Sequence, residues 1–328
     1  MKILIIGPSN IGDAILMSAV IPWLRRRYPG AHLTLVLGER ALSFFEDDPR
    51  VQRLINADLF DSAIGRLRLA CLLFQDHPDG VVDVRHTLYP LLLKPLSAWR
   101  YLRRPPLQIR HMRERYLWIG CAQVPGLIAP RKDDRSFLEG AIEWSANDQA
   151  HVEYLWNRWQ LASAHPLVVI CPGTRSHIKR WGSSGFAQVA DRLIAQQGAQ
   201  VILSGEPSEG PIVQEILSLM SHRAYSSVGL TTIRQLGLFM RRAGVVITND
   251  SAALHLASAL QVPTVAIFGP TDETKYGPMA PRYRIIRRRL FCSPCEQALC
   301  RFNHECMRFI SPDEVYRAAV DLLGFVKK

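Results

Sequence analysis

Residues 244–272 read GVVITNDSAALHLASALQVPTVAIFGPTD, and this stretch decides the fold class of the chain. The apolar run at 245–247 predicts a strand that is buried on both faces, and the Asn-Asp-Ser that follows is typical of a helix start. A second apolar run at 264–269 predicts a parallel strand after that helix. The stretch therefore predicts a strand, helix, strand unit of a parallel sheet.

The helix start within this stretch is a candidate nucleotide site. In a doubly wound sheet the ligand crevice borders the carboxyl ends of the strands, and a helix amino terminus there offers amides to a phosphate. We expect Asp250 or Ser251 to cap the helix through its side chain, with His255 one turn further on the same face. The alternative is an ordinary capped unit in which His255 is a packed core residue.

The same alternation of apolar strands and helices runs along most of the 328 residues. Two domains are expected at this length, and with 48% hydrophobic residues the chain has enough apolar material for two cores. We expect an α/β protein made of two Rossmann-like halves, with domains at 1–162 and 163–310 and a closing helix at 311–328. The expected strands are 2–7, 32–38, 80–85, 167–171, 199–205, 244–249 and 264–269, and the first helix is expected at 12–27.

The composition narrows the class and the compartment. A formal charge of +11 predicts an anionic partner, which charge alone leaves open between nucleic acid, acidic lipid and a phosphorylated sugar. No uncharged apolar run reaches the roughly 20 residues that a membrane-spanning helix needs. Seven cysteines in a chain of this size do not indicate a disulfide scaffold, and we expect a cytoplasmic protein.

The first glycine turn reads GPSNIGD, residues 7–13. It lacks the Lys-Ser/Thr of a P-loop and the G-x-G-x-x-G of dinucleotide folds. Because a carboxylate at this helix start would repel a phosphate, Asp13 is better suited to accept a proton from a hydroxyl as a general base. The alternative is that Asp13 only stabilises the first helical turn.

A second turn reads PGTRSHIKRW, residues 172–181, and follows a predicted strand. The Thr174 hydroxyl can donate to phosphate oxygens, while Lys179 or Arg180 can offset the charge of a departing diphosphate. The alternative is a solvated charged turn. Glu209, in SGEPSEG after the next predicted strand, could bind ribose hydroxyls or act as a cap.

Three separated motifs together resemble the family 9 glycosyltransferases, the ADP-heptose:lipopolysaccharide heptosyltransferases. They are IGPSNIGDAILMSAVIP at 6–22, CPGTRSHIKRWGSSGFAQVADRLIAQQGAQVILSG at 171–205 and TNDSAALHLASALQVPTVAIFGPTD at 248–272. The resemblance covers nearly the whole chain. It implies a GT-B fold of two facing Rossmann-like domains and an inverting transfer of heptose without a metal or other cofactor.

The resemblance also implies roles for individual residues. Asp13 matches the family's base and Lys179 its phosphate-binding lysine. Thr174, Glu209, Asp250, Ser251 and His255 match donor-site positions. At Ala252 the family usually has glycine, and the methyl group narrows the space beside the diphosphate, which bears on the identity of the donor.

The function implied is transfer of a heptose or related sugar from ADP-heptose to the inner core of lipopolysaccharide, on the cytoplasmic face of the inner membrane. A basic segment around 100–115, expected to be a loop or mobile helix, lies in the acceptor-side half, and we expect Arg110 and Arg113 to bind the acceptor or a membrane surface. The alternative is a solvated flank, because charge runs usually face water. Nucleic acid is not expected, because no recognised binding module accompanies the arginines. The other functions considered are a GT-B nucleotide-sugar epimerase and a non-catalytic protein that binds nucleotide sugars or membranes.

Four cysteines near the end of the chain, at positions 292, 295, 300 and 306, form a separate cluster. Their spacing is not that of a paired C-x2-C zinc ribbon. A structural metal, a redox bridge and reduced thiols are all open, and none is expected to be catalytic.

Overall fold

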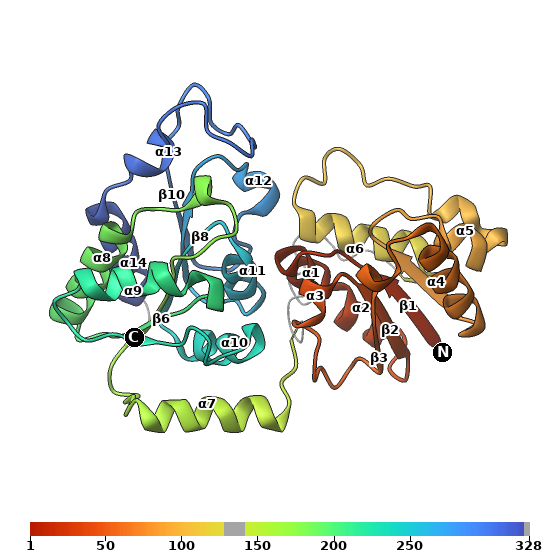
Figure 1. Cartoon of the computed structure of the whole chain (residues 1–328), viewed down its shortest axis with the longest axis horizontal. Coiled ribbons are helices and arrows are strands. Elements are labelled where there is room, and N and C mark those ends of the chain that lie inside the picture. The colour runs from red at the N-terminus through yellow and green to blue at the C-terminus, as the bar shows by residue number, and fades with distance from the viewer. Residues whose placement is uncertain (128–141, 325–328) are drawn as a thin grey trace. The chain divides into compact units, whose positions relative to one another are not determined.

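The computed structural model describes residues 1–127 and 142–324 and divides into two compact units, Met1–Ser145 and Ala146–Lys328 (Figure 1). Each unit is built on one parallel sheet with helices around it. The α/β class and the GT-B architecture of two Rossmann-like domains are therefore confirmed.

The sheet of the first unit has the strand order β3-β2-β1-β4, and all its pairs are parallel. Its strands are β1 (Lys2–Ile6), β2 (His32–Leu37), β3 (Arg53–Asn56) and β4 (Gly80–Asp83). Its helices are α1 (Ile11–Met17), α2 (Val20–Arg27), α3 (Glu39–Leu42), η1 (Ala57–Phe60), α4 (Ala63–Gln75), α5 (Tyr89–Leu93), η2 (Pro95–Arg100) and α6 (Met112–Gln123).

The helix expected at 12–27 is in fact two helices, α1 and α2, with a break at Ser18 and Ala19. Pro22 explains the break, since it has no N–H to donate to the carbonyl of Ser18 and its ring would collide with that carbonyl. The Ser18 carbonyl instead accepts from the amide of Ile21 at 3.0 Å.

The second unit has a six-stranded parallel sheet in the order β10-β9-β8-β5-β6-β7. Its strands are β5 (Leu167–Cys171), β6 (Gln200–Leu203), β7 (Tyr225–Ser226), β8 (Val245–Asn249), β9 (Thr264–Phe268) and β10 (Tyr283–Arg287). Its helices are α7 (Ala146–Arg158), η4 (His177–Lys179), α8 (Ser183–Gln197), η5 (Pro207–Glu209), α9 (Gly210–Leu219), α10 (Ile233–Arg242), α11 (Ala252–Ala259), α12 (Glu273–Tyr276), α13 (Glu305–Arg308) and α14 (Pro312–Gly324).

Helices α7 and α14 both belong to the second unit. Helix α7 packs on α10, so the compact units divide at Ser145, before the position 162 expected from the sequence. Helix α14 packs on α8 and contributes Val315 and Leu322 to the core that also holds Val168 of β5. Among the helices that the structure describes, none has the length and apolarity that a bilayer crossing requires.

Each sheet has one point at which the strand order reverses direction. In the first unit this point lies between β1 and β4, and in the second between β5 and β8. Chain segments that leave adjacent strands on opposite faces of a sheet open a crevice at the carboxyl ends of those strands, where ligands of such folds bind. The turn that leads to Asp13 follows β1, and the segments that hold Lys179 and Asp250 follow β5 and β8.

Candidate functional site

The structure brings Thr174, Lys179 and Asp250 together at the carboxyl ends of β5 and β8. The ammonium group of Lys179, at the end of η4, lies 2.6 Å from a carboxylate oxygen of Asp250. The Asp250 side chain is 5% exposed and that of Lys179 is 30% exposed. The cation is thus held at the rim of the sheet with part of its surface open to a ligand.

Asn249, which we did not predict as a site residue, fixes this arrangement. Its side-chain amide donates to the carbonyl of Pro172 at 2.7 Å and accepts from the amide of Trp181 at 3.2 Å. The Trp181 ring is buried against Phe186, and its indole N–H donates to the carbonyl of Ile310. The strand-end position of Asn249, directly before the Asp-Ser, was the available signal, because polar side chains at strand ends in such sheets lie at the crevice.

Thr174 and Arg180 each make a hydrogen bond that involves the turn after β5. The Thr174 hydroxyl is buried and donates to the backbone carbonyl of Asp250 at 3.4 Å, rather than facing open space. The Arg180 guanidinium donates to the carbonyl of Thr174 at 3.1 Å. Arg180 therefore fixes the turn, and Lys179 is the cation of this pair that lies beside Asp250.

The expectation that Asp250 or Ser251 caps α11 through its side chain is wrong. Ser251 occupies the N-cap position, but its hydroxyl makes no capping bond and lies 3.2 Å from the hydroxyl of Thr248. The carboxylate of Asp250 pairs with Lys179 instead. The first amides of a helix have no partner within the helix, so the start of α11 can offer donors to an anion.

Ala252 and His255 lie in the first turns of α11. Ala252 is the first residue of the helix and is partly exposed. His255 is 6% exposed, and its ring centroid lies 6.2 Å from that of Tyr276 in α12. The ring is thus packed between α11 and the segment that follows β9.

Glu209 lies against Gly173 in the turn after β5, the same turn that holds Thr174. A Cβ atom placed on Gly173 would be 2.0 Å from the Glu209 carboxyl carbon, and one on Gly205 would be 2.7 Å from a carboxylate oxygen. Glu209 also accepts from the amide of Glu206 at 2.9 Å in a capping box. Burial raises the pKa of Glu209, with the charge of Glu206 adding to the effect and Arg180 opposing it. The capping role is therefore realised, and the carboxylate occupies the space that a Cβ atom at Gly173 or Gly205 would take.

In the first unit, Asp13 lies in the first turn of α1 at the carboxyl end of β1. Its carboxylate accepts a hydrogen bond of 3.3 Å from the hydroxyl of Tyr116 in α6. Tyr116 was not predicted. It lies on the buried face of α6, which includes Tyr116, Leu117 and Gly120.

The two arginines that we expected to bind the acceptor differ in accessibility. Arg110 is exposed, whereas Arg113 has 0% exposed surface, and burial lowers its pKa to about 10. Arg113 does not present its guanidinium to solvent, because it lies one helical turn before Tyr116 and Leu117 on the buried face of α6, and its binding of an acceptor stays a prediction. The sequence had predicted a loop or mobile helix here, and such a segment would have left Arg113 exposed. The structure instead has helix α6, which begins at Met112 and packs one face against the core.

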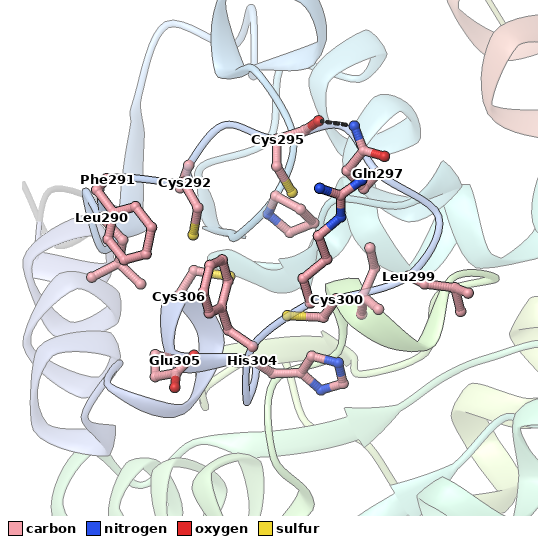
Figure 2. A pocket seen from close by; sticks show the side chains of 15 residues that line it. Leu290, Phe291, Cys292, Cys295, Gln297, Leu299, Cys300, His304, Glu305 and Cys306 are labelled. Atoms are coloured by element: carbon pink, nitrogen blue, oxygen red, sulfur yellow. Dashed lines mark hydrogen bonds between the residues drawn. The ribbon is translucent and has the colours of Figure 1, made fainter.

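The cysteine cluster lines a pocket of about 310 Å³ in the second unit (Figure 2). Cys292, Cys295, Cys300 and Cys306 are free thiols, and burial together with the other thiols raises the pKa of Cys306 to about 11. In the two ranges that the structure covers, no group of three or more His, Cys, Asp or Glu side chains is placed to hold a metal ion. The pocket borders the turn that holds Lys179 and the segment after β9, since Ile178 and Pro270 also line it.

Comparisons with known proteins agree with this geometry. Residues 136–305 match the model of glycosyltransferase family 9 (heptosyltransferase). The lipopolysaccharide heptosyltransferase 2 of Escherichia coli K12 is 26% identical over 310 residues, which cover 88% of each chain.

Two solved structures share the fold. The E. coli ADP-heptose LPS heptosyltransferase II superposes with a TM-score of 0.74 at 23% identity and covers all of both chains. The family 9 glycosyltransferase of Veillonella parvula superposes with a TM-score of 0.79 at 22% identity and covers 99% of this chain and 97% of its own. With two Rossmann-like units and a match over about half its length, the chain belongs to glycosyltransferase family 9 (heptosyltransferase).

Proposed function

We propose that this protein transfers a heptose, or a related sugar, from ADP-heptose to the inner core of lipopolysaccharide, with inversion at the anomeric carbon and without a metal. The observation that carries the proposal is the Lys179 and Asp250 pair beside the start of α11, at the reversal point of a sheet in a family 9 chain. The E. coli relative is named a lipopolysaccharide heptosyltransferase, and the similar E. coli structure is named an ADP-heptose LPS heptosyltransferase, which support the choice of acceptor and donor.

The donor would be held by the second unit. The ammonium group of Lys179 and the first amides of α11 place positive charge where a diphosphate would gain negative charge as it departs. Asp250 positions the lysine, and Thr174 joins the turn to the backbone of Asp250. His255 packs behind the helix start, and Glu209 supports the turn at Gly173. Ala252, at the first position of α11, reduces the room beside the diphosphate compared with glycine.

Asp13 would act as the general base. The acceptor hydroxyl passes its proton to the Asp13 carboxylate while its oxygen bonds to the anomeric carbon of the donor. The bond from that carbon to the diphosphate breaks, and the electron pair leaves with ADP. One displacement gives inversion. The Tyr116 hydroxyl, which donates to Asp13, would orient the carboxylate.

The acceptor is proposed to be lipid-linked, so the enzyme would work at the cytoplasmic face of the inner membrane as a peripheral protein. Arg110 is exposed near the start of α6 and is the arginine of the predicted pair that is accessible to the anionic acceptor. Nucleic acid is not a proposed partner.

The test is to incubate the purified chain with a panel of nucleotide sugars, with and without a truncated lipopolysaccharide acceptor, and to measure nucleoside diphosphate release. ADP release from ADP-heptose only with acceptor, and a product heavier by one heptose, is the expected result. Release of a free or isomerised sugar without acceptor would favour a GT-B epimerase. Donor binding with no turnover under any condition would favour a non-catalytic binding protein.

A further inference from the structure

The first unit exposes an unusual number of large apolar side chains on α5, on η2 and next to them. Leu96 of η2 is 99% exposed, and Leu88, Leu92, Trp99 and Leu102 are each more than half exposed. We call these five residues the α5 surface. Scattered single apolar residues are normal on a protein surface, whereas five exposed ones between residues 88 and 102 point to an interaction site.

The exposed side chains are not a sign that the segment is unpacked. Leu91 and Leu93 of α5 pack against the core of the unit, which also contains Leu69 and Leu73 of α4. The Tyr89 hydroxyl donates to the carbonyl of Arg66 in α4 at 3.5 Å. Figure 1 shows α5 beside α4. The segment is therefore fixed by one set of leucines while a second set faces outward.

Helix α4 continues the apolar character on the neighbouring element. Ile64, Leu67, Cys71 and Phe74 recur at helical spacing and are all exposed. The buried positions of this helix, Gly65, Leu69 and Leu73, lie on its other face. A helix on a water-exposed surface normally has polar side chains on the face opposite its core-facing stripe, whereas α4 has apolar side chains there.

The charge along the segment that carries the α5 surface is of one sign. Between Asp83 and Glu114 the sequence contains no acidic residue, while Arg85, Lys94, Arg100, Arg103 and Arg104 accompany the exposed leucines. The Arg100 guanidinium lies 5.3 Å from the ring centroid of Trp99. Apolar side chains, a tryptophan and several basic groups together suit the surface of an anionic bilayer. The apolar side chains would insert into the interface, and the basic groups would contact lipid phosphates.

A second copy of this chain is a poorer fit for the same surface. A twofold contact would bring each patch against its own equivalent and place like charges opposite one another. An anionic lipid surface satisfies both the apolar and the basic groups.

We propose that the α5 surface docks the first unit onto the anionic lipid bilayer. This inference rests on the proposed function, because a lipid-linked acceptor places the reaction at a membrane. It goes further by assigning contact to named side chains that bear no catalytic role.

Co-sedimentation with vesicles tests the proposal. The wild-type protein should bind vesicles of phosphatidylethanolamine and phosphatidylglycerol, and bind phosphatidylcholine vesicles at least about tenfold more weakly. The double variant Leu96→Asp/Trp99→Asp should lose about tenfold or more in vesicle affinity, since two apolar anchors are replaced by charges that the lipids repel. The variant Arg103→Glu/Arg104→Glu should lose a similar factor and most of the salt dependence.

Leu219→Asp provides the matched control, because Leu219 is 51% exposed at the end of α9 in the second unit. It should bind vesicles as the wild type does. Vesicle affinity of the Leu96→Asp/Trp99→Asp variant equal to that of wild type would overturn the proposal, as would absence of wild-type binding. A concentration-dependent dimer in sedimentation equilibrium that this variant abolishes would assign the surface to self-association instead.

A water-soluble truncated acceptor separates this proposal from the enzymatic one. With that acceptor and ADP-heptose, the Leu96→Asp/Trp99→Asp variant should release ADP at the wild-type rate. Normal vesicle binding with no ADP release by any form would sink the proposed function and leave the docking surface standing.

Discussion

The ammonium group of Lys179 lies 2.6 Å from a carboxylate oxygen of Asp250, which joins the turn after β5 to the end of β8. The pair holds the cation at the point where the strand order reverses. The pair is expected to affect both the stability of the fold and kcat. Variants of Lys179 and Asp250 can separate the two effects.

Replacing Lys179 with Met should lower kcat by roughly 10²- to 10³-fold, because the charge that stabilises the departing diphosphate is lost. It should also destabilise the fold, since the Asp250 carboxylate remains buried without its cation. The double variant Lys179→Met/Asp250→Asn should recover stability in urea denaturation but not kcat. Recovery of both would mean that the pair is structural only.

Replacing Asp13 with Asn should lower kcat by roughly 10²- to 10⁴-fold while donor affinity, measured by calorimetry, stays near that of wild type. Tyr116→Phe removes only the hydrogen bond to the carboxylate and should cost much less. Steady-state kinetics with a soluble acceptor provide the measurement. Wild-type turnover by the Asp13→Asn protein would remove Asp13 as the base.

Replacing Gly173 with Ala should destabilise the second unit by about 1 kcal/mol, because the Glu209 carboxyl group, 2.0 Å from the new Cβ, must swing away and give up its hydrogen bond from the Glu206 amide. The atoms closest to that Cβ all belong to Glu209. The double variant Gly173→Ala/Glu209→Ala should therefore lose less stability than the sum of the losses in the two single variants. Thermal denaturation of the four proteins completes the cycle. Gly30→Ala, where a Cβ meets no atom within 4 Å, should stay within about 0.5 kcal/mol of wild type. Strict additivity in the cycle would contradict this account.

The stability that Glu314 contributes at the start of α14 should decrease as the pH falls. The hydrogen bond from Arg288 lowers the pKa of Glu314 to about 2, and hydrogen bonds from Ser311 contribute. A depressed carboxyl pKa gives stability that is fully present above the ordinary value of 4.5 and is lost as the pH falls toward 2. The melting-temperature difference between wild type and Glu314→Gln should therefore shrink across that window. In an Arg288→Met background the same comparison should depend less on pH, because only the hydrogen bonds from Ser311 remain to lower the pKa of Glu314.

The sequence predicted the elements that are buried on both faces. The strands β1, β2, β4, β5, β6, β8 and β9 are short, mostly apolar runs, and all of them except the edge strand β4 are interior parallel strands of their sheets. The closing helix expected at 311–328 is α14, which begins at Pro312, where the Glu314 amide donates to the Ser311 hydroxyl at 3.3 Å. The edge strands β3, β7 and β10 were missed, since they are short or carry charged and half-buried residues.

What the sequence determined by itself was local: apolar period, turn residues and three motifs whose order identifies the family. What only the tertiary structure decided was which partner each polar side chain takes. Asp250 pairs with Lys179, 71 positions away, rather than capping its own helix, and Arg113 falls on the buried face of α6. Helix period and burial can be estimated along a chain, but a hydrogen bond or ion pair between distant segments depends on how the strands are ordered in the sheet, which no single segment encodes.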